Sequence, residues 1–436
     1  MATPPRVLIV GGGGREHALA WALARATPRP TVLAAPGNAG MAGLATLLPI
    51  GTDDLLKISE VARREAVDLV VVGPEAPLCA GLADLLAADG VAVFGCSRAA
   101  AELEGSKAYC KMLLQRHRIP TAAFGTFSMV PEAELFIDAR MAEGAGRLVV
   151  KADGLAGGKG VMICDSAADA KRAARALLAP AHTTTPPAIV IEEFLVGREA
   201  SLMALVVDEA VALLPGAEDH KTLRDGDVGP MTGGMGVVSP TPVLDELTVR
   251  RALDEIIRPT ARALVAEGRP FRGLLFAGLM VTASGPKVLE FNCRFGDPET
   301  EAVLIRLAAG PQGDLYPALE AVAHGRAPRA PAFSDRASAT VVLAQAGYPG
   351  PLAPPVEIRG LAAAAELPDV VVFHAGTRAE GDRVLTAGGR VLAVSALGDD
   401  AAEARRRAYA AVDRIEFPGA QLRRDIGARA APPAPR

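Results

Sequence analysis

The first hundred residues alternate short β-branched runs with stretches of helical spacing, and this pattern constrains the fold most strongly. Four runs are predicted strands: Val7–Val10, Thr31–Ala35, Asp68–Val72 and Val91–Gly95. Strands separated by helices form a helix-covered parallel sheet, and ligands bind at the carboxyl ends of such strands. Glycine-rich turns follow the first three strands at that edge. An α/β fold with a ligand site at these turns is therefore predicted.

The composition is that of an ordinary globular chain that acts on small molecules. The sequence has 436 residues, half of them hydrophobic, and a net charge of −4. This length exceeds a single hydrophobic core and predicts several domains. Without a basic excess or a long apolar run, no nucleic-acid or membrane partner is expected. The five cysteines are scattered and no pair has CxxC spacing, which indicates a reducing compartment, so we expect a cytoplasmic protein.

The glycines after the first strand superficially fit a dinucleotide-binding fingerprint. Glycines at this point let the backbone approach a phosphate at a helix N-terminus. The third glycine of that fingerprint falls at Glu16, where a charged side chain would obstruct close packing of the helix on the strand. NAD binding, and with it a dehydrogenase, is therefore disfavoured. A phosphate or sugar-phosphate site is the favoured interpretation, and a tight turn without a ligand is the alternative.

A second glycine-rich segment, Lys151–Val161, is predicted to close over a triphosphate. The Walker A order is absent because Gly160, rather than Ser or Thr, follows Lys159. A mobile glycine loop with a lysine can still cover phosphates and withdraw. Lysine is rare in this chain, so four lysines beside glycines or on apolar strands are predicted to supply a compact, mobile charge: Lys107, Lys151, Lys159 and Lys221. The alternative is a flexible hairpin without a ligand.

The segment Ile191–Glu199 is a candidate nucleotide contact. Its apolar backbone could present N–H and C=O groups to an adenine edge, and Glu199 could accept hydrogen bonds from ribose hydroxyls. Alone this pattern is a weak signal, and a solvated strand end would explain it equally well.

The densest cluster of polar residues begins on a predicted apolar strand. Glu290 and Asn292 are two residues apart, so a strand places both on one face. A carboxylate and an amide oxygen suit Mg²⁺ that is already held by phosphates. Leu289 and Phe291 are predicted to face a core on the other side, and Arg294 adds a bidentate clamp for an anion. The alternative is an edge strand with exposed polar residues.

Three further expectations concern secondary structure. One helix is predicted over Ser97–His117. The segment Asp219–Ser239 is dense in Gly and Asp and is predicted to be a long functional loop without secondary structure. Gly273–Val281 and Lys287–Phe291 are predicted to pair as a hairpin. No Ser/His/Asp arrangement is evident, so catalysis by a covalent protein nucleophile is not predicted.

Taken in order, these and other blocks resemble the phosphoribosylamine–glycine ligase family of ATP-grasp enzymes. The resemblance runs from about residue 7 to residue 430 and rests on Gly13–Ala18, Pro36–Gly40, Val72–Leu78, Leu103–Lys107, Lys151–Val161, Asp219–Lys221, Gly233–Gly236, Glu290–Thr300, His374–Thr377 and Asp425–Gly427. So many blocks in the same order make a chance match implausible.

The resemblance implies an α/β fold, α+β in parts, with ATP-grasp architecture. It implies an N-terminal parallel-sheet domain at residues 1–102 and a two-part ATP-grasp core at 103–328, with a lid subdomain at about 121–190. A small mixed α/β domain at 329–430 and a disordered tail at 431–436 complete the expected organisation.

The reaction that the resemblance implies is the ATP-dependent ligation of glycine to 5-phosphoribosylamine through glycyl phosphate. It yields glycinamide ribonucleotide, ADP and phosphate in purine biosynthesis. The implied ligands of Mg²⁺ or Mn²⁺ are Glu290 and Asn292, and the implied catalytic residues are Arg294, Lys151 and Asp219. The implied ATP contacts are Lys107, Lys151, Gly154, Gly157, Gly158, Lys159, Gly160, Glu192, Glu193, Phe194, Leu195 and Glu199. The implied contacts to glycine and phosphoribosylamine are Gly13, Gly14, Arg15, Glu16, Asn38, Gly73, Pro74, Glu75, Asp219, Lys221, Gly233, Gly234, Arg294 and Asp297.

The sequence departs from the family pattern at several positions. Glu218 and Glu301 both stand where the family usually has Gln. Val228 replaces a usual Thr, and Met231 replaces a usual Asn. These four departures bear on local contacts to the substrates, whereas the replacement of a more polar turn at Leu352–Pro355 bears only on the C-terminal domain.

Two other functions stay open at this point. Another ATP-grasp carboxylate–amine ligase, or a carboxylase-like enzyme, would share the ATP and metal residues but lack the three N-terminal glycine turns together. A nucleotide-binding regulator without turnover is disfavoured by the intact Glu290, Asn292, Lys151 and Lys159. The sequence also leaves open whether the chain is a monomer and whether it transiently contacts the enzyme that supplies phosphoribosylamine.

Overall fold

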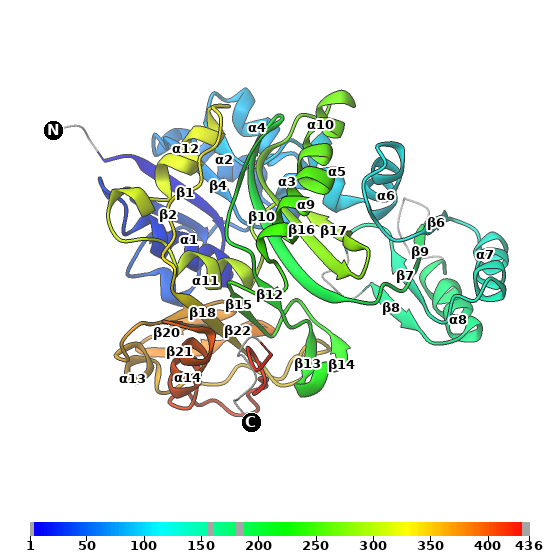
Figure 1. Ribbon diagram of the computed structural model, residues 1–436. Helices are drawn as coiled ribbons and strands as arrows, with labels where there is room; N and C mark the ends of the chain where they lie inside the picture. Colours follow the sequence, from blue (N-terminus) through cyan, green and yellow to red (C-terminus); the bar gives the residue numbers. More distant parts are fainter. Residues whose placement is uncertain (1–3, 156–159, 180–186, 430–436) are drawn as a thin grey trace.

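The computed structural model describes residues 4–155, 160–179 and 187–429. Figure 1 shows a broad body from which one small lobe extends. The predicted tail at 431–436 and the predicted ATP contacts Gly157, Gly158 and Lys159 lie outside the described residues.

The N-terminal region is a parallel sheet in the order β3-β2-β1-β4-β5. Its strands are β1 (Arg6–Gly11), β2 (Thr31–Pro36), β3 (Thr46–Leu47), β4 (Leu69–Val72) and β5 (Val93–Phe94), and its helices are α1 (Gly14–Leu23), α2 (Leu55–Arg64), α3 (Glu75–Ala80) and α4 (Leu82–Ala88). Val7 and Ile9 are buried in one core, and Leu8 and Val10 in another. A strand buried on both faces is a continuous apolar run, so the parallel sheet predicted from such runs is confirmed.

The body also contains an antiparallel sheet in the order β11-β10-β16-β17. Its elements are β10 (Arg198–Val207), β11 (Ala210–Leu213), β16 (Arg272–Thr282) and β17 (Gly285–Asn292), with helices α9 (Glu246–Ala252) and α10 (Arg258–Ala266) joined through a π-helical turn at Leu253–Ile257. The predicted hairpin is confirmed as the pair β16–β17.

One expectation about β17 is wrong, because the strand contains a bulge. Gly278 pairs with Glu290 but its neighbour Leu279 pairs with Val288, so Leu289 is an extra residue without a partner. Leu289 therefore does not share a core with Phe291. It packs beside Leu195 and Met280, whereas Phe291 lies in the main core.

The predicted helix over Ser97–His117 is wrong in one respect, since it is two helices, α5 (Arg98–Gly105) and α6 (Lys107–Arg116). Ser106 between them is extended, with φ −134° and ψ 112°, and its hydroxyl accepts a hydrogen bond from the Tyr109 N–H. This N-cap starts a new helix at Lys107. The break matters because it places Lys107 in the first turn of α6.

The small lobe, on the right in Figure 1, is a sheet in the order β6-β9-β7-β8 with two helices. Its elements are β6 (Phe124–Phe127), α7 (Val130–Ala142), β7 (Leu148–Ala152), β8 (Val161–Cys164), α8 (Ala167–Leu177) and β9 (Ile189–Glu193). The lobe has its own core, which includes Ile137, Val150 and Ile191. Strands β7 and β9 carry Lys151 and Glu192 toward the body.

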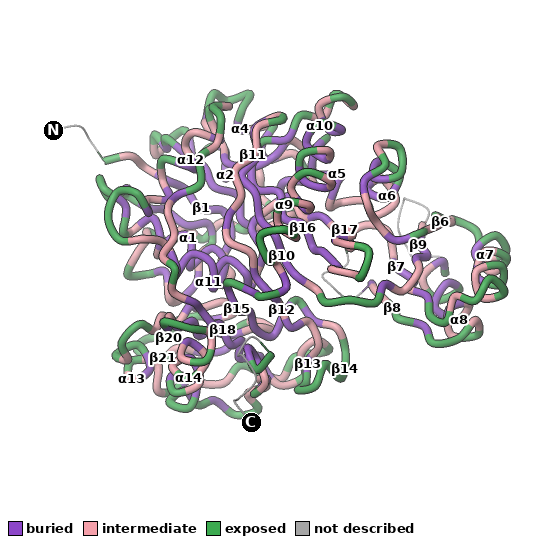
Figure 2. The backbone as a smooth tube through the Cα atoms, in the orientation of Figure 1, coloured by how far each residue is buried: buried purple, intermediate pink, exposed green. Residues whose placement is uncertain are grey.

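The C-terminal region is built on a sheet in the order β12-β15-β18-β22-β19. Its elements are β12 (Glu218–Asp219), β15 (Gly236–Ser239), β18 (Ala337–Ala344), α13 (Leu361–Ala365), β19 (Val370–His374), β20 (Thr377–Glu380), β21 (Arg383–Thr386), β22 (Arg390–Gly398) and α14 (Ala401–Val412). The helices α11 (Glu299–Leu304) and α12 (Tyr316–Ala323) lie in the chain between β15 and β18. Figure 2 shows burial concentrated in the sheets.

The segment Asp219–Ser239 is not the structureless loop that its composition predicts. It contains β12, β15 and the hairpin β13 (Thr222–Arg224) with β14 (Val228–Met231). Strand β15 pairs with both β12 and β18, so this segment joins the C-terminal sheet.

The division of the chain at residue 329 stays a prediction. Among the described residues, no helix combines the length and apolarity that a membrane crossing requires.

Candidate active site

A cavity of about 490 Å³ lies where the lobe, the central sheet and the two terminal regions meet. The predicted site residues that line it are Arg15, Pro74, Glu75, Lys107, Lys151, Gly154, Gly160, Glu192, Glu193, Phe194, Leu195, Glu199, Asp219, Lys221, Gly233, Glu290, Asn292, Arg294 and Asp297. The chain thus folds residues that are far apart in sequence around one space large enough for a nucleotide and small substrates.

One end of the cavity is apolar. Leu195, Met280 and the bulged Leu289 pack together there. One oxygen of the Glu193 carboxylate, Oε1, accepts hydrogen bonds from the Ala123 N–H at 3.1 Å and from Lys287 Nζ at 3.2 Å, so its role as an ATP contact stays a prediction. This end offers flat apolar contacts suited to a purine ring.

Next to the apolar end, one carboxylate lies between two buried lysines. Glu192 Oε1 is 3.0 Å from Lys151 Nζ, and its Oε2 is 3.0 Å from Lys111 Nζ. All three side chains are buried. Lys111 also donates to the Thr121 hydroxyl. Glu192 therefore holds two cations in the wall, and Lys111 is a site residue that the sequence analysis missed.

Lys107 reaches the same region from the start of α6. Its Nζ donates to the Gly154 carbonyl at 2.8 Å, and Asp153 accepts from the Ala108 N–H and the Ser106 hydroxyl. Burial lowers the pKa of Lys107. The turn that opens the glycine-rich segment is thus fixed to the N-terminus of α6.

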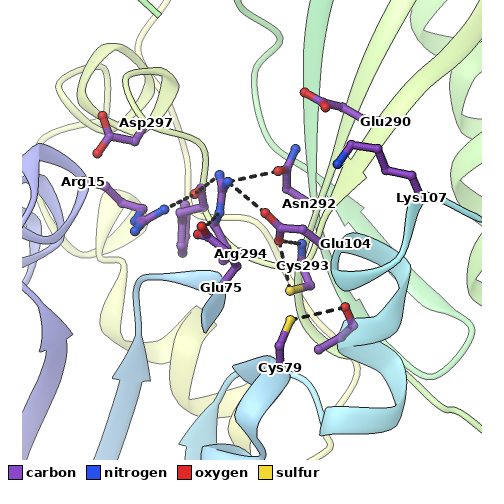
Figure 3. A network of polar contacts seen from close by, with 12 residues as sticks. Arg15, Glu75, Cys79, Glu104, Lys107, Glu290, Asn292, Cys293, Arg294 and Asp297 are labelled. Atoms are coloured by element: carbon purple, nitrogen blue, oxygen red, sulfur yellow. Dashed lines mark hydrogen bonds and ion pairs between the residues drawn. The ribbon is translucent and has the colours of Figure 1, made fainter. Parts of the chain in front are cut away.

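The predicted metal ligands lie on the strand β17 beside a lysine. Glu290 Oε1 is 3.2 Å from Lys221 Nζ, and Glu199 Oε2 is 3.8 Å from the same nitrogen. The positive charge of Lys221, acting against burial, lowers the pKa of Glu290 to about 2. Glu290 is therefore an ionised oxygen donor at neutral pH. Figure 3 shows Glu290 and Asn292 at the end of the strand, near Lys107.

Arg294 is the most densely bonded cation of the site (Figure 3). It donates to Asn292 Oδ1 at 2.9 Å, to Glu104 Oε1 at 2.9 Å and to Glu75 Oε2 at 3.3 Å. Burial opposes its charge, but the carboxylates of Glu104 and Glu75 outweigh burial and raise its pKa. Glu104, which also accepts from the Cys293 N–H, is a second site residue that was missed.

Near Lys221, the half-buried carboxyl group of Asp219 and the buried one of Glu299 act on each other. Burial and the adjacent Glu299 raise the pKa of Asp219. The carboxylate of Glu299 accepts from the Ser201 hydroxyl at 2.9 Å. Because like charges disfavour joint ionisation, each of these two carboxyl groups binds a proton more readily than an isolated one.

Arg390, on β22, brings the C-terminal region into the site and was also missed. It donates to the Gly233 carbonyl at 2.6 Å and to the Asp297 carbonyl at 2.7 Å, and it lies 3.1 Å from the Asp297 carboxylate. The Tyr348 hydroxyl accepts from the Gly233 N–H at 3.0 Å. Arg390 and Tyr348 together fix the Gly233 peptide and the Asp297 loop.

Six of the predicted substrate contacts are not among the residues that line this cavity: Gly13, Gly14, Glu16, Asn38, Gly73 and Gly234. Glu16 is buried, accepts from the Gly13 N–H at 2.5 Å and orients Arg15, also at 2.5 Å. It fits because Gly11 and Gly73 leave the space that a Cβ would fill. A charged residue at this position is thus accommodated by glycines on the two strands rather than obstructing them.

Asn38 joins the N-terminal turn to the C-terminal region. Its side-chain amide donates to the carbonyls of Gly12 at 3.0 Å and His374 at 2.7 Å, and its oxygen accepts from the Gly40 N–H. His374 N–H in turn donates to His17 Nδ1 at 2.8 Å. These bonds hold the first glycine turn in place beside Arg15.

Comparison with protein-family models matches each of the three regions of the chain to a domain of one family. Three models match, described as the N domain, the ATP-grasp (A) domain and the C domain of phosphoribosylglycinamide synthetase, at residues 5–104, 105–300 and 338–429. The chain belongs to this family. The ATP-grasp fold and the membership that the sequence blocks predicted are therefore confirmed, and the chain is an ATP-dependent ligase.

Individual relatives agree with the family. The chain is 47% identical over 430 residues to a protein of Allochromatium vinosum named phosphoribosylamine–glycine ligase, covering 98% of each chain. The crystal structure of a phosphoribosylamine–glycine ligase from Thermotoga maritima has a TM-score of 0.81 and 33% identity, covering 97% of this chain and all of that one. A biotin carboxylase from Campylobacter jejuni has a TM-score of 0.70 at 15% identity over 96% and 93% of the two chains, which is a likeness of fold.

We predict that Glu192→Ala destabilises this family member, because it leaves Lys111 and Lys151 buried without their shared partner. Breaking a buried ion pair costs about 3–5 kcal/mol, so the free energy of unfolding in urea should fall by about that amount. The control is Glu134→Ala, which removes the exposed pair with Arg175 and should cost less than about 1 kcal/mol. Equal losses in the two variants would contradict the buried triad.

We predict that Arg390→Met lowers activity through the end of the cavity at Gly233 and Asp297, and leaves nucleotide binding at the apolar and lysine-lined end unchanged. Without the guanidinium, the Gly233 peptide and the Asp297 loop lose their shared donor. Displacement of a positioning group costs on the order of tenfold to a hundredfold in kcat/KM, while the Kd for ADP should not change. Arg336→Met, which removes a surface pair with Asp369, is the matched control. An unchanged kcat/KM in Arg390→Met would refute this role.

Proposed function

We propose that this enzyme uses ATP to join glycine to 5-phosphoribosylamine, giving glycinamide ribonucleotide, ADP and phosphate in purine biosynthesis. The observation that carries the proposal is a cavity lined by an apolar cluster, several lysines and an arginine–carboxylate group, and we infer that they follow one another along it. That order suits adenine, the phosphates and the two small substrates in turn. The names of the relatives that span the whole chain support the same reaction.

We propose that the reaction passes through glycyl phosphate. A carboxylate is a poor acyl donor, so one of its oxygens must first become a leaving group, and transfer of the γ-phosphoryl group to glycine achieves this. The amine of phosphoribosylamine then attacks the carbonyl carbon and phosphate leaves. Such steps need positioning, neutralised charge and exclusion of water rather than a protein nucleophile. The described cavity is rich in cations and has no evident nucleophile–base pair, which supports this route.

In this proposal the lysines bind the polyphosphate. Lys107, Lys151 and Lys221 point into one region, and each is held by a carbonyl or carboxylate partner. Donors fixed in advance need little reorganisation when charge moves between phosphates. Lys111 acts through Glu192, which sets the position of Lys151.

We propose that Glu290 and Asn292 bind Mg²⁺, or Mn²⁺ in its place. The donor set fits: Glu290 is ionised, Asn292 offers an amide oxygen, and no cluster of three acidic, His or Cys ligands occurs in the described part of the chain. Mg²⁺ is commonly held by one or two protein oxygens together with substrate phosphates. When bound, the ion would neutralise charge on the phosphates during transfer.

The remaining residues are proposed to handle the small substrates. Arg294 and Asp219 would bind glycine and steady its acyl phosphate, with Arg390 holding the loop of Asp297 beside them. Arg15, Glu75 and the turn at Gly13–Gly14 would hold phosphoribosylamine at the start of α1, where backbone N–H groups favour an anion.

We place the enzyme in the cytoplasm, since its five cysteines are free thiols.

Glu290→Ala and Asn292→Ala are expected to abolish ligation while the fold survives, because both side chains lie at the cavity rather than in a core. ADP release should fall by on the order of a hundredfold or more, as when one stabilising donor of a reacting charge is removed. Circular dichroism and urea unfolding would check folding. Near wild-type turnover in Glu290→Ala would show that the metal assignment is wrong.

The substrate assignment has its own test. ADP release is expected to require both glycine and phosphoribosylamine, and alanine or β-alanine should not replace glycine. Equal rates with these analogues would refute glycine as the substrate and favour another ATP-grasp carboxylate–amine ligase.

A further inference from the structure

A fully buried carboxyl group, that of Glu301 in α11, lies just behind the substrate end of the cavity. Its exposure is 0%, and among the described residues neither of its oxygens has a hydrogen-bond partner. One oxygen lies against Gly14 at the start of α1, so close that a Cβ at Gly14 would clash with it. Glu301 does not line the cavity, but Asp297, in the loop just before α11, does.

The two cations nearest to Glu301, Arg15 and Arg390, are each paired with another carboxylate. α11 packs against α1, β15, β18 and β22. The charges that act on Glu301 are those of Asp297, Arg390 and Arg15. The neighbouring elements and turns also carry Glu16, His17, Glu299 and His374. Both arginines have other partners: Arg15 donates to Glu16, and Arg390 is paired with Asp297.

Nor can the two histidines balance a negative charge there. Burial lowers the pKa of His17 to about 3 and that of His374 to about 4, so both imidazoles are neutral at working pH. A buried carboxyl group without a cation takes a proton, because an isolated buried charge is very costly. Burial, and next the negative charge of Asp297, raise the pKa of Glu301 well above its usual value.

Glu218 provides the contrast within the same chain. Family resemblance gives glutamine as the usual residue at both positions. Yet the Glu218 carboxylate accepts two hydrogen bonds from Arg198, at 2.8 and 3.0 Å, and one from the Thr241 hydroxyl at 2.7 Å. Its negative charge is balanced by Arg198, whereas that of Glu301 would not be.

We propose that Glu301 works as a neutral acid, a positioning residue that packs behind Gly14 in the turn that binds phosphoribosylamine and adds no like charge beside Asp297. This role rests on the proposed function. With its proton, Glu301 does what an uncharged amide does, and it adds no negative charge to those of Asp297 and Glu16 beside the start of α1. Loss of the proton places a second carboxylate next to Asp297 and behind the turn that receives an anionic phosphate, so binding of that substrate weakens.

The kinetic test compares wild type with Glu301→Gln across pH, with Glu218→Gln as the matched control. The wild-type kcat/KM for phosphoribosylamine should fall at high pH by up to about tenfold per pH unit. This decline should be absent in Glu301→Gln and retained in Glu218→Gln, and the KM for glycine should not follow it. The same decline in wild type and Glu301→Gln would overturn the proposal, as would a low kcat/KM of Glu301→Gln at every pH.

A second measurement does not depend on activity. At neutral pH, infrared spectra should contain a carbonyl stretch of a protonated carboxyl group that Glu301→Gln lacks and Glu218→Gln retains. The unfolded carboxyl group ionises near its usual pKa of 4.5 while the folded one keeps its proton, so stability of the wild type falls as pH rises above that value. The unfolding equilibrium constant should rise relative to Glu301→Gln by up to about tenfold per pH unit.

The two measurements separate failure of the proposal from failure of the proposed function. Absence of the protonated band, or equal pH dependence of unfolding in wild type and Glu301→Gln, would overturn the neutral acid whatever the reaction is. A wild-type enzyme that shows the band but never ligates glycine would overturn the proposed function, and with it the role in binding phosphoribosylamine.

Discussion

The position of the buried guanidinium of Arg294 is the constraint on which the geometry of the cavity depends. It bonds to Glu75 at the start of α3, to Glu104 in α5 and to Asn292 at the end of β17. These three residues belong to the N-terminal sheet, the connecting helices and the central sheet. Removal of the guanidinium would leave the carboxylates of Glu75 and Glu104 unmatched, which is far more costly than the loss of a surface pair. One cation therefore fixes the predicted metal ligand Asn292 relative to the N-terminal turns.

Cations are paired with carboxylates along the rest of the cavity wall too, before any ligand binds. Lys221 lies against Glu290, Lys151 against Glu192, and Arg390 against Asp297. This arrangement stabilises a dense cluster of positive charge that would otherwise repel itself. It also orients the donors in advance, so anionic phosphates meet a prepared surface instead of flexible lysines. The triad of Lys111, Glu192 and Lys151 further ties the lobe to the body at its base.

Much of the fold and of the site could be predicted from local sequence, and the failures share a physical cause. Apolar runs and the β16–β17 hairpin were predictable because periodicity and turn residues are local signals. The break at Ser106 depends on Asp153, a residue of the lobe that accepts hydrogen bonds from the start of α6. The bulge at Leu289 depends on pairing with β16. Such non-local bonds leave no periodic trace in the chain.

The site residues that could not be predicted also depend on non-local contacts. Lys111 and Arg390 find their partners, Glu192 and Asp297, 81 and 93 positions away in sequence. A signal existed for each, since Lys111 is one of few lysines and sits among apolar residues, and Arg390 follows two glycines. The signal indicates that such a residue is unusual, but not which partner it meets.

The pair Glu218 and Glu301 shows why partners matter more than residue type. Sequence comparison treats both as the same replacement of an amide by an acid. The fold gives Glu218 a guanidinium and a hydroxyl, whereas it surrounds Glu301 with a like charge, neutral imidazoles and arginines committed elsewhere. The cost of a buried charge therefore makes one replacement an ion pair and the other a neutral acid. The charge state of a residue in this site is a property of the tertiary structure, and it can be argued only after the contacts are known.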